Sequence, residues 1–148
     1  MSAASSKNRE SHIVRVVVDT NIFISSFFGG YPGRIIDLWK TGRITLCLSN
    51  AIIEEYIDVL QRMGIADTRE FDELMLLFRS QFNCVFINRT PSLSVCVDPD
   101  DNKFIEAAVA LKAEYIISGD NHLKSLKKYC GILIMPPRDF IEYTVKDK

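Results

Sequence analysis

Short β-branched runs alternate with helical patterns along almost the whole of this sequence. The first run, IVRVVV at 13–18, is nearly continuous in apolar residues, which is typical of a strand buried on both faces. Similar runs follow at 44–49, 83–88, 115–118 and 132–136. Because connections between parallel strands cross over in a right-handed sense and pack back onto the sheet, this alternation predicts an α/β fold: a doubly wound parallel sheet with helices on both faces.

Helical patterns occupy the segments between these runs. They are predicted at 20–28, 32–41, 51–63, 67–80, 101–114, 119–130 and 136–144. Pro32 and Gly42 bound the second of these segments, and Ser49 or Asn50 caps the third, where apolar residues recur at helical spacing. Residues 89–100 lack such a pattern and predict an irregular connection, with a short edge strand around 95–97 left open.

The composition fits one domain with one core. The chain has 148 residues, of which 47% are hydrophobic and 25% are charged. Residues 1–12 have no apolar run of the length that a signal peptide needs, and we expect a flexible tail there, before a single domain at 13–148. Since no apolar stretch approaches the ~18 residues that span a bilayer, we expect a soluble, cytoplasmic protein that does not associate with membranes.

Charge and cysteine content give no direct sign of a nucleic-acid or zinc protein. The formal net charge is −1 and the pI is about 6.1, whereas phosphate affinity normally comes from surplus lysine and arginine. Any nucleic-acid function must therefore come from a local site. The four cysteines are dispersed, unlike zinc or redox pairs, and fit a reducing compartment. His12 and His122 do not form a zinc-like pair either.

Several carboxylates lie near the ends of predicted strands. Asp19 directly follows the first strand, and Asp120 follows the fourth after one glycine. Because ligands of parallel sheets bind beyond the carboxyl ends of the strands, we expect these two acids to share one rim. Asp98, Asp100 and Asp101 precede the alanine-rich helix, and geometry alone leaves open which of them reaches that rim. Each acid could instead serve as a helix cap or turn former.

The helix predicted at 51–63 adds two glutamates, Glu54 and Glu55. Glu55 has Ile52 and Val59 as neighbours and borders the buried face, whereas Glu54 is predicted to be solvated. Carboxylates gathered in one cleft raise one another's pKa, and a hard divalent cation relieves that repulsion. Ligands that are all oxygen favour Mg²⁺ or Mn²⁺ over zinc, so the pattern predicts one of these ions as the cofactor.

Four motifs follow one another in the chain: VVVDTN at 16–21, SNAIIEEYIDVL at 49–60, DPDDNKFIEAA at 98–108 and YIISGDNHL at 115–123. With these motifs the chain from 13 to 143 resembles the PIN-domain ribonucleases, and most of all the branch described as the toxin half of toxin–antitoxin pairs. The resemblance implies a PIN-like sheet of strand order 3-2-1-4-5, a homodimer, hydrolysis of single-stranded or exposed RNA, and a cognate antitoxin protein as a partner.

The resemblance also implies roles for individual residues. The catalytic and metal-binding acids of the family match Asp19, Glu55, Asp101 and Asp120. The supporting positions match Thr20, Asn21, Asn102 and Ser118. The Asn21 amide is expected to hold the acids in place. Ser118 stands where the family often has threonine, so that a hydroxyl is kept.

Together these positions predict a metal-dependent endoribonuclease. Asp19 is expected to be the central metal ligand, Asp101 and Asp120 to complete one or two metal positions, and Glu55 to orient the attacking water or accept its proton. Basic residues could guide the RNA strand towards the metal; the candidates are Arg34, Lys40, Arg43, Lys124, Lys127 and Lys128.

Two other functions stay open at this point. In a Mg²⁺-dependent phosphatase or phosphotransferase, Asp19 would be the nucleophile, but such enzymes usually have a second Asp two residues later, where this chain has Asn21. A non-catalytic PIN-like module that only binds RNA or protein would be expected to lack one of the acids, whereas all four matching positions are acidic. RNA hydrolysis is therefore the preferred interpretation.

Overall fold

A single sheet of six strands forms the centre of the protein. The computed structural model describes residues 13–90, 92–96 and 98–145, and the tail expected at 1–12 lies outside these ranges. The strands are β1 (Val14–Val18), β2 (Ile44–Ser49), β3 (Cys84–Ile87), β4 (Tyr115–Ile117), β5 (Lys128–Tyr129) and β6 (Ile132–Met135). They lie in the order β3-β2-β1-β4-β6-β5, and every pair is parallel except β5 with β6.

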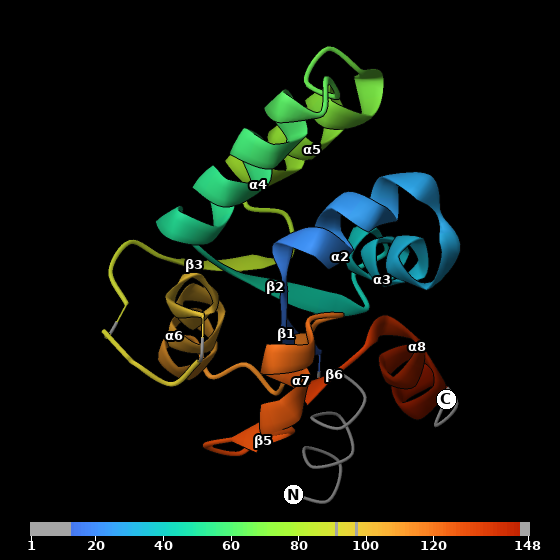
Figure 1. The fold of residues 1–148 in the computed structure, drawn as a ribbon. Helices are drawn as coiled ribbons and strands as arrows, with labels where there is room; N and C mark the ends of the chain where they lie inside the picture. Colours follow the sequence, from blue (N-terminus) through green and yellow to red (C-terminus); the bar gives the residue numbers. More distant parts are fainter. Residues whose placement is uncertain (1–12, 91, 97, 146–148) are drawn as a thin grey trace, which may run out of the picture.

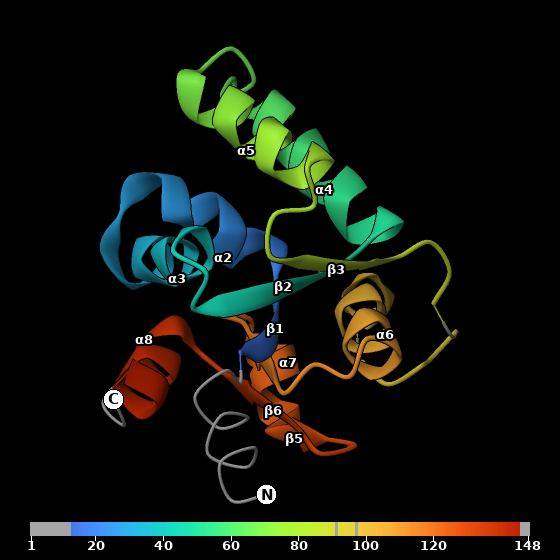
Figure 2. The ribbon, with the colours of Figure 1, turned by 180° about the vertical axis from the view of Figure 1, so that it is seen from behind.

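Helices cover both faces of this sheet. They are α2 (Thr20–Ser25), α3 (Gly30–Lys40), α4 (Asn50–Arg62), α5 (Arg69–Arg79), α6 (Asn102–Ala110), α7 (Asn121–Leu126) and α8 (Pro137–Phe140), with 3-10 turns at Ser26–Phe28 and Pro99–Asp101 and a π-helical turn at Ile141–Val145. α3 and α8 lie on one side of the sheet and α6 on the other (Figure 1), and the reverse view shows the same separation (Figure 2). The predicted α/β architecture is confirmed. α4 and α5 run side by side and extend beyond the sheet.

The five parallel strands have the predicted order, and the sheet differs from the prediction at one edge. The helix predicted at 119–130 is wrong in its second half, because α7 ends at Leu126 and β5 then pairs antiparallel with β6. Lys127 takes a φ of +58°, which a helix does not allow. Cys130 and Gly131 follow with φ of +50° and +81°, as the two central residues of a tight hairpin require.

Two further segments depart from the sequence pattern. The helix predicted at 101–114 already ends at Ala110, because Lys112 takes a φ of +57° in a left-handed helix terminus. The edge strand left open around 95–97 does not form at the described positions 95 and 96, and position 97 lies outside the described residues. The N–H groups of Val95 and Cys96 donate to the Asn102 side chain instead of to a neighbouring strand.

The buried core ties α4 to the end of β1. Val16, Val17 and Val18 are fully buried, as expected for a strand covered on both faces. Tyr56, from α4, is fully buried too; its hydroxyl donates to the carbonyl of Val18, and its ring stacks on Phe23 with the ring centroids 4.0 Å apart. This packing fixes α4 relative to the carboxyl end of β1.

Two expectations drawn from composition can be compared with the structure. In the part of the chain that is described, no helix is long and apolar enough to cross a lipid bilayer. All four cysteines are free, but their surroundings differ, since Cys47 is buried and Cys130 is exposed.

Candidate active site

The carboxyl ends of β1 and β4 meet at one rim of the sheet. The last residues of these two strands pair in register, so that Asp19 and Asp120 come from neighbouring strands. A hollow of about 300 Å³ opens beside them, which we call the acidic pocket. Its lining consists of Asp19, Thr20, Asn21, Glu55, Asp58, Val59, Arg62, Asp101, Phe104 and Asp120. The four acids that match the family motifs all border it, whereas Asp98 and Asp100 are exposed outside it.

Asp19 is buried at the end of β1, with 3% of its surface exposed. Its Oδ1 accepts a hydrogen bond from the N–H of Ile22 at 2.9 Å and thereby caps α2. Its Oδ2 accepts from the Ser118 hydroxyl. Burial raises the pKa of Asp19 and the charge of Asp120 adds to the rise, while the hydrogen bonds from Ser118 and Ile22 oppose it. Asp19 is therefore a helix cap whose negative charge is held at a cost in free energy.

Ser118 links the acids of the two neighbouring strands. Its side chain is fully buried, and its oxygen accepts from the N–H of Asp120 at 2.9 Å while its hydroxyl donates to Asp19. Asp120 in turn accepts from the N–H of Leu123 at 3.1 Å at the start of α7. Asn21 lines the pocket but is exposed, and its amide makes no hydrogen bond to a carboxylate of the described residues. The hydrogen bonds that link Asp19 to the backbone of Asp120 pass through Ser118.

Asp101 stands between a 3-10 turn and α6. Its main chain occupies the N-cap position of α6, but its side chain makes no capping hydrogen bond. Its Oδ2 is buried and has no hydrogen-bond partner among the residues that the structure describes. Burial raises the pKa of Asp101 to about 6, and the charges of Asp120, Asp98 and Asp19 contribute to that rise. A buried carboxylate oxygen without a donor is unfavourable unless a ligand meets it.

The neighbours of Asp101 have structural roles. Asp98 is extended, and its Oδ1 accepts from the N–H two residues later at 3.0 Å, which closes a turn. Asn102 is buried, and its Oδ1 accepts from the N–H groups of Val95 at 3.1 Å and Cys96 at 2.8 Å. These bonds attach the irregular connection to the first turn of α6. They therefore fix the position at which Asp101 enters the pocket.

Glu55 borders the pocket from α4, while Glu54 is exposed, as the helical pattern predicted. The Oε2 of Glu55 accepts from the Thr20 hydroxyl, and its Oε1 pairs with the ammonium of Lys103. Lys103 did not emerge as a site residue from the sequence. A signal for it exists, because a lysine in the first turn of a helix faces the unfavourable end of the helix dipole and needs a nearby anion.

The oxygens of the acidic pocket fit a hard divalent cation. Within 13–90, 92–96 and 98–145, no three His, Cys, Asp or Glu side chains converge closely enough to hold an ion as they lie. The donor set is nevertheless made of carboxylates, one of which has a buried oxygen without a partner in these ranges. A divalent cation with oxygen ligands would neutralise such charges. His12 and the side chain of His122 lie outside the described structure.

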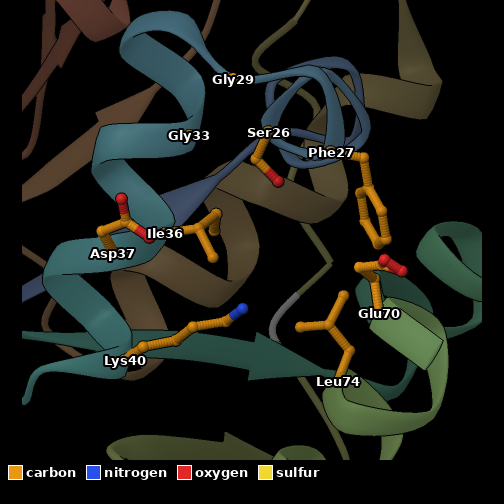
Figure 3. A pocket seen from close by; sticks show the side chains of 9 residues that line it. All are labelled: Ser26, Phe27, Gly29, Gly33, Ile36, Asp37, Lys40, Glu70 and Leu74. Carbon is orange, nitrogen blue, oxygen red and sulfur yellow. The ribbon is translucent and has the colours of Figure 1, made fainter.

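Two other hollows lie away from these acids. One, of about 310 Å³, lies between α3 and the start of α5, and we call it the helical pocket; Asp37, Lys40 and Glu70 contribute exposed charges to it. Figure 3 shows Lys40 pointing into this space from α3. The other, of about 360 Å³, is an apolar groove between α4, α5 and β3.

The six basic residues expected to guide RNA do not line the acidic pocket. The cation in its lining is Arg62, which pairs with Asp58 at 3.0 Å.

A parallel sheet with acidic side chains at the carboxyl ends of its strands defines the class of protein, and sequence comparison gives the family. The PIN domain profile matches residues 15–122, so the chain belongs to the PIN domain family, whose members are generally nucleases. An uncharacterized protein of Methanocaldococcus jannaschii is 36% identical over 143 residues, which cover 87% of this chain and 90% of that protein. The segment that matches the PIN domain includes all four acids of the pocket.

Proposed function

We propose that this PIN domain is a metal-dependent endoribonuclease that hydrolyses the phosphodiester backbone of RNA. The observation that carries the proposal is the meeting of partly and fully buried carboxylates at one rim, where Asp101 Oδ2 has no partner in the described structure. Perturbed carboxylates that converge in a cleft are more common at catalytic sites than elsewhere. Membership of the PIN family supports a nuclease-type activity.

Mg²⁺ or Mn²⁺ would be held by Asp19, Asp101 and Asp120, with Glu55 completing the set. When bound, such a cation lowers the pKa of a water molecule and offsets the charge on the non-bridging phosphate oxygens. Ser118 donates to Asp19 and accepts from the backbone of Asp120, so it orients two of these acids at once. Ligands that are oriented in advance bind a metal with less loss of conformational freedom.

Hydrolysis would break the bond between phosphorus and the 3′ oxygen. A water molecule attacks phosphorus in line with that bond, and its proton passes to the Glu55 carboxylate, which Thr20 holds towards the rim. The 3′ oxygen leaves and takes up a proton from solvent, and Glu55 returns the proton it accepted to solvent. The products are a 5′-phosphate and a 3′-hydroxyl. Because the acids repel phosphate in the absence of metal, RNA binding should depend on the cation as well.

The proposal includes a toxin-type role with a cognate antitoxin and a homodimer, which rest on the family resemblance, and a cytoplasmic location, which rests on the composition of the chain. The free cysteines support a reducing compartment. The apolar groove between α4, α5 and β3 supports a protein partner, since Phe86 at its edge is 40% exposed and exposed apolar patches often mark such contacts.

A nuclease assay tests the proposal directly. End-labelled single-stranded RNA would be incubated with the protein in Mg²⁺, in Mn²⁺ and in EDTA, next to Asp19→Asn prepared in parallel. We expect cleavage that requires the metal and is absent in the variant. RNA binding without cleavage would favour the binding-module alternative, and a trapped phospho-aspartate at Asp19 would favour the phosphotransferase. Equal cleavage by both proteins would point to a contaminating nuclease and contradict the assignment.

A further inference from the structure

Lys103 and Glu55 form an ion pair at the edge of the acidic pocket. The pair joins α6 to α4, and the side chains of Lys103 and Glu55 are only 18% and 30% exposed. The Thr20 hydroxyl donates to the other Glu55 oxygen, so both oxygens are engaged. Asp101 differs in this respect, because its Oδ2 has no partner in the described part of the chain. A metal ion could therefore meet Asp101 directly, whereas at Glu55 Oε1 it would meet an ammonium whose positive charge repels it.

A second ion pair in the same pocket provides a contrast. Arg62 and Asp58 lie one helical turn apart on α4, and their side chains are 68% and 64% exposed. Exposed pairs of this kind contribute little, because water screens both charges and the side chains lose conformational freedom. A pair that is shielded from water interacts more strongly. The Lys103 ammonium is thus the cation that most affects the charge of Glu55, although Arg62 lines the pocket and Lys103 does not.

We propose that Lys103 is a resident counter-cation for Glu55 that a divalent metal displaces when it binds. The inference rests on the proposed metal-dependent function and adds a positioning residue to it. Before metal binds, Lys103 neutralises Glu55 and holds its carboxylate at the rim. Once metal binds, the ammonium, which lies 5.7 Å from the centroid of the Phe104 ring in the metal-free pair, would move away from Oε1 on its flexible four-carbon stem. Lys103 therefore weakens metal binding while it keeps a ligand in place.

Metal binding alone tests this inference, without RNA. Mn²⁺ would be titrated into the full chain by calorimetry, with wild type, Lys103→Gln, Lys103→Arg and Arg62→Gln compared. We expect Lys103→Gln to bind Mn²⁺ about tenfold more tightly, because one competing charge is gone. Lys103→Arg, which keeps the charge, should bind like wild type or more weakly. Arg62→Gln is the matched control: it removes one positive charge from the same pocket without releasing Glu55, and should change the affinity less than about twofold.

A double-mutant cycle separates direct exchange from a general effect of charge. In a Glu55→Gln background there is no carboxylate for lysine and metal to share, so adding Lys103→Gln should no longer alter Mn²⁺ affinity. If the gain from Lys103→Gln persists in that background, or equals the gain from Arg62→Gln, the exchange does not occur. Wild-type protein that binds no Mn²⁺ would contradict the proposed metal-dependent function itself. Binding that is normal but insensitive to Lys103→Gln would overturn this inference and leave the function standing.

Discussion

The acidic pocket and the helical pocket have almost the same volume, about 300 and 310 Å³, and charged side chains border both. They differ in how the charges are held. Charges of both signs line the helical pocket (Figure 3), and the side chains that carry them are exposed to water. In the acidic pocket, Asp19 is buried and Asp101 is partly buried, and burial raises the pKa of each. The charges of the helical pocket therefore need no ligand, whereas the carboxylates of the acidic pocket favour a bound cation.

Charge by itself therefore does not distinguish a functional site in this protein. Surface charges are hydrated, so a hollow among them needs no ligand to compensate for desolvation. Carboxylates brought together at the carboxyl ends of two neighbouring strands repel one another, and the fold holds them there despite the cost. Removing charges from each pocket in turn tests this difference.

The largest effect is expected for Asp19→Asn. The variant should lose more than about 100-fold in cleavage rate, beyond the range found for residues that only support a metal ligand. Its melting temperature without metal should rise, because the amide oxygen still accepts from the Ile22 N–H and no charge is buried. Turnover on single-stranded RNA and thermal unfolding in EDTA measure the two effects. A fall of several degrees would mean that the cap on α2 is the main role of Asp19.

A smaller but still large effect is expected for Glu55→Gln. Loss of a group that handles the proton of the attacking water lowers kcat by about 100-fold. Glu54→Gln is the matched control, because it lies one residue earlier on α4 and is exposed. It should change kcat by less than about twofold, as surface substitutions usually do. Steady-state kinetics measure kcat for both variants. Equal losses of kcat would contradict the assignment of Glu55.

The next effect is a pH dependence of stability. The ordinary pKa of Asp101 is 3.8 and its pKa in the folded protein is about 6. Between these values the folded state holds a proton that the unfolded state releases, so this group lowers the free energy of unfolding as the pH rises through the window. Asp101→Asn cannot titrate, so it removes this loss of stability. Its melting temperature should therefore increase relative to wild type from about pH 4 to pH 6 without metal.

Asp100→Asn serves as the control for this pH series, because it removes a neighbouring carboxylate that is exposed outside the pocket. It should follow wild type at every pH. Added Mn²⁺ should abolish the difference between wild type and Asp101→Asn above pH 6, since the Asp101 carboxylate is ionised there and the metal offsets its buried charge. A difference that is the same at pH 4 and pH 7 would mean that the Asp101 carboxyl does not titrate in this window.

The smallest effect is expected in the helical pocket. Asp37→Asn and Lys40→Gln each remove one exposed charge, and both should change cleavage rate by less than about twofold and stability by less than about 0.5 kcal/mol. Cleavage assays and urea unfolding would detect changes in cleavage rate and stability larger than these. A large loss of RNA cleavage in Lys40→Gln would show that the helical pocket contacts the substrate, and the contrast between the two hollows would fail.

The rim of the sheet was predictable because it depends on topology. Once β1 and β4 are expected to be parallel neighbours, Asp19 and Asp120 must share an edge, whatever their side chains contact. Topology alone does not decide which of Asp98, Asp100 and Asp101 reaches the rim. Asp101 enters the pocket because the Asn102 side chain fixes the start of α6, and that contact joins residues of an irregular connection that no periodic pattern describes.

Other features depend on contacts between distant segments. The residues of β5 belong to a segment with a good helical pattern, and the antiparallel pairing of Lys128 with Leu133 and of Tyr129 with Ile132 overrides that preference. The pairing of Lys103 with Glu55 depends on how α4 and α6 pack, which single-residue propensities do not encode. Local patterns and the family resemblance predicted the acids that line the pocket but not the cation beside them.

The hydrogen bond from Tyr56 to the carbonyl of Val18 has a consequence for motion. It fastens α4 one residue before Asp19 and one residue after Glu55, and stacking on Phe23 supports it. Movement of α4 as a whole would break a buried bond and belongs to the microsecond-to-millisecond range, whereas rotation of the Glu55 side chain takes picoseconds to nanoseconds. The site should therefore adapt to an ion by fast torsional changes, and backbone relaxation-dispersion signals of α4 should be equally flat with and without Mn²⁺.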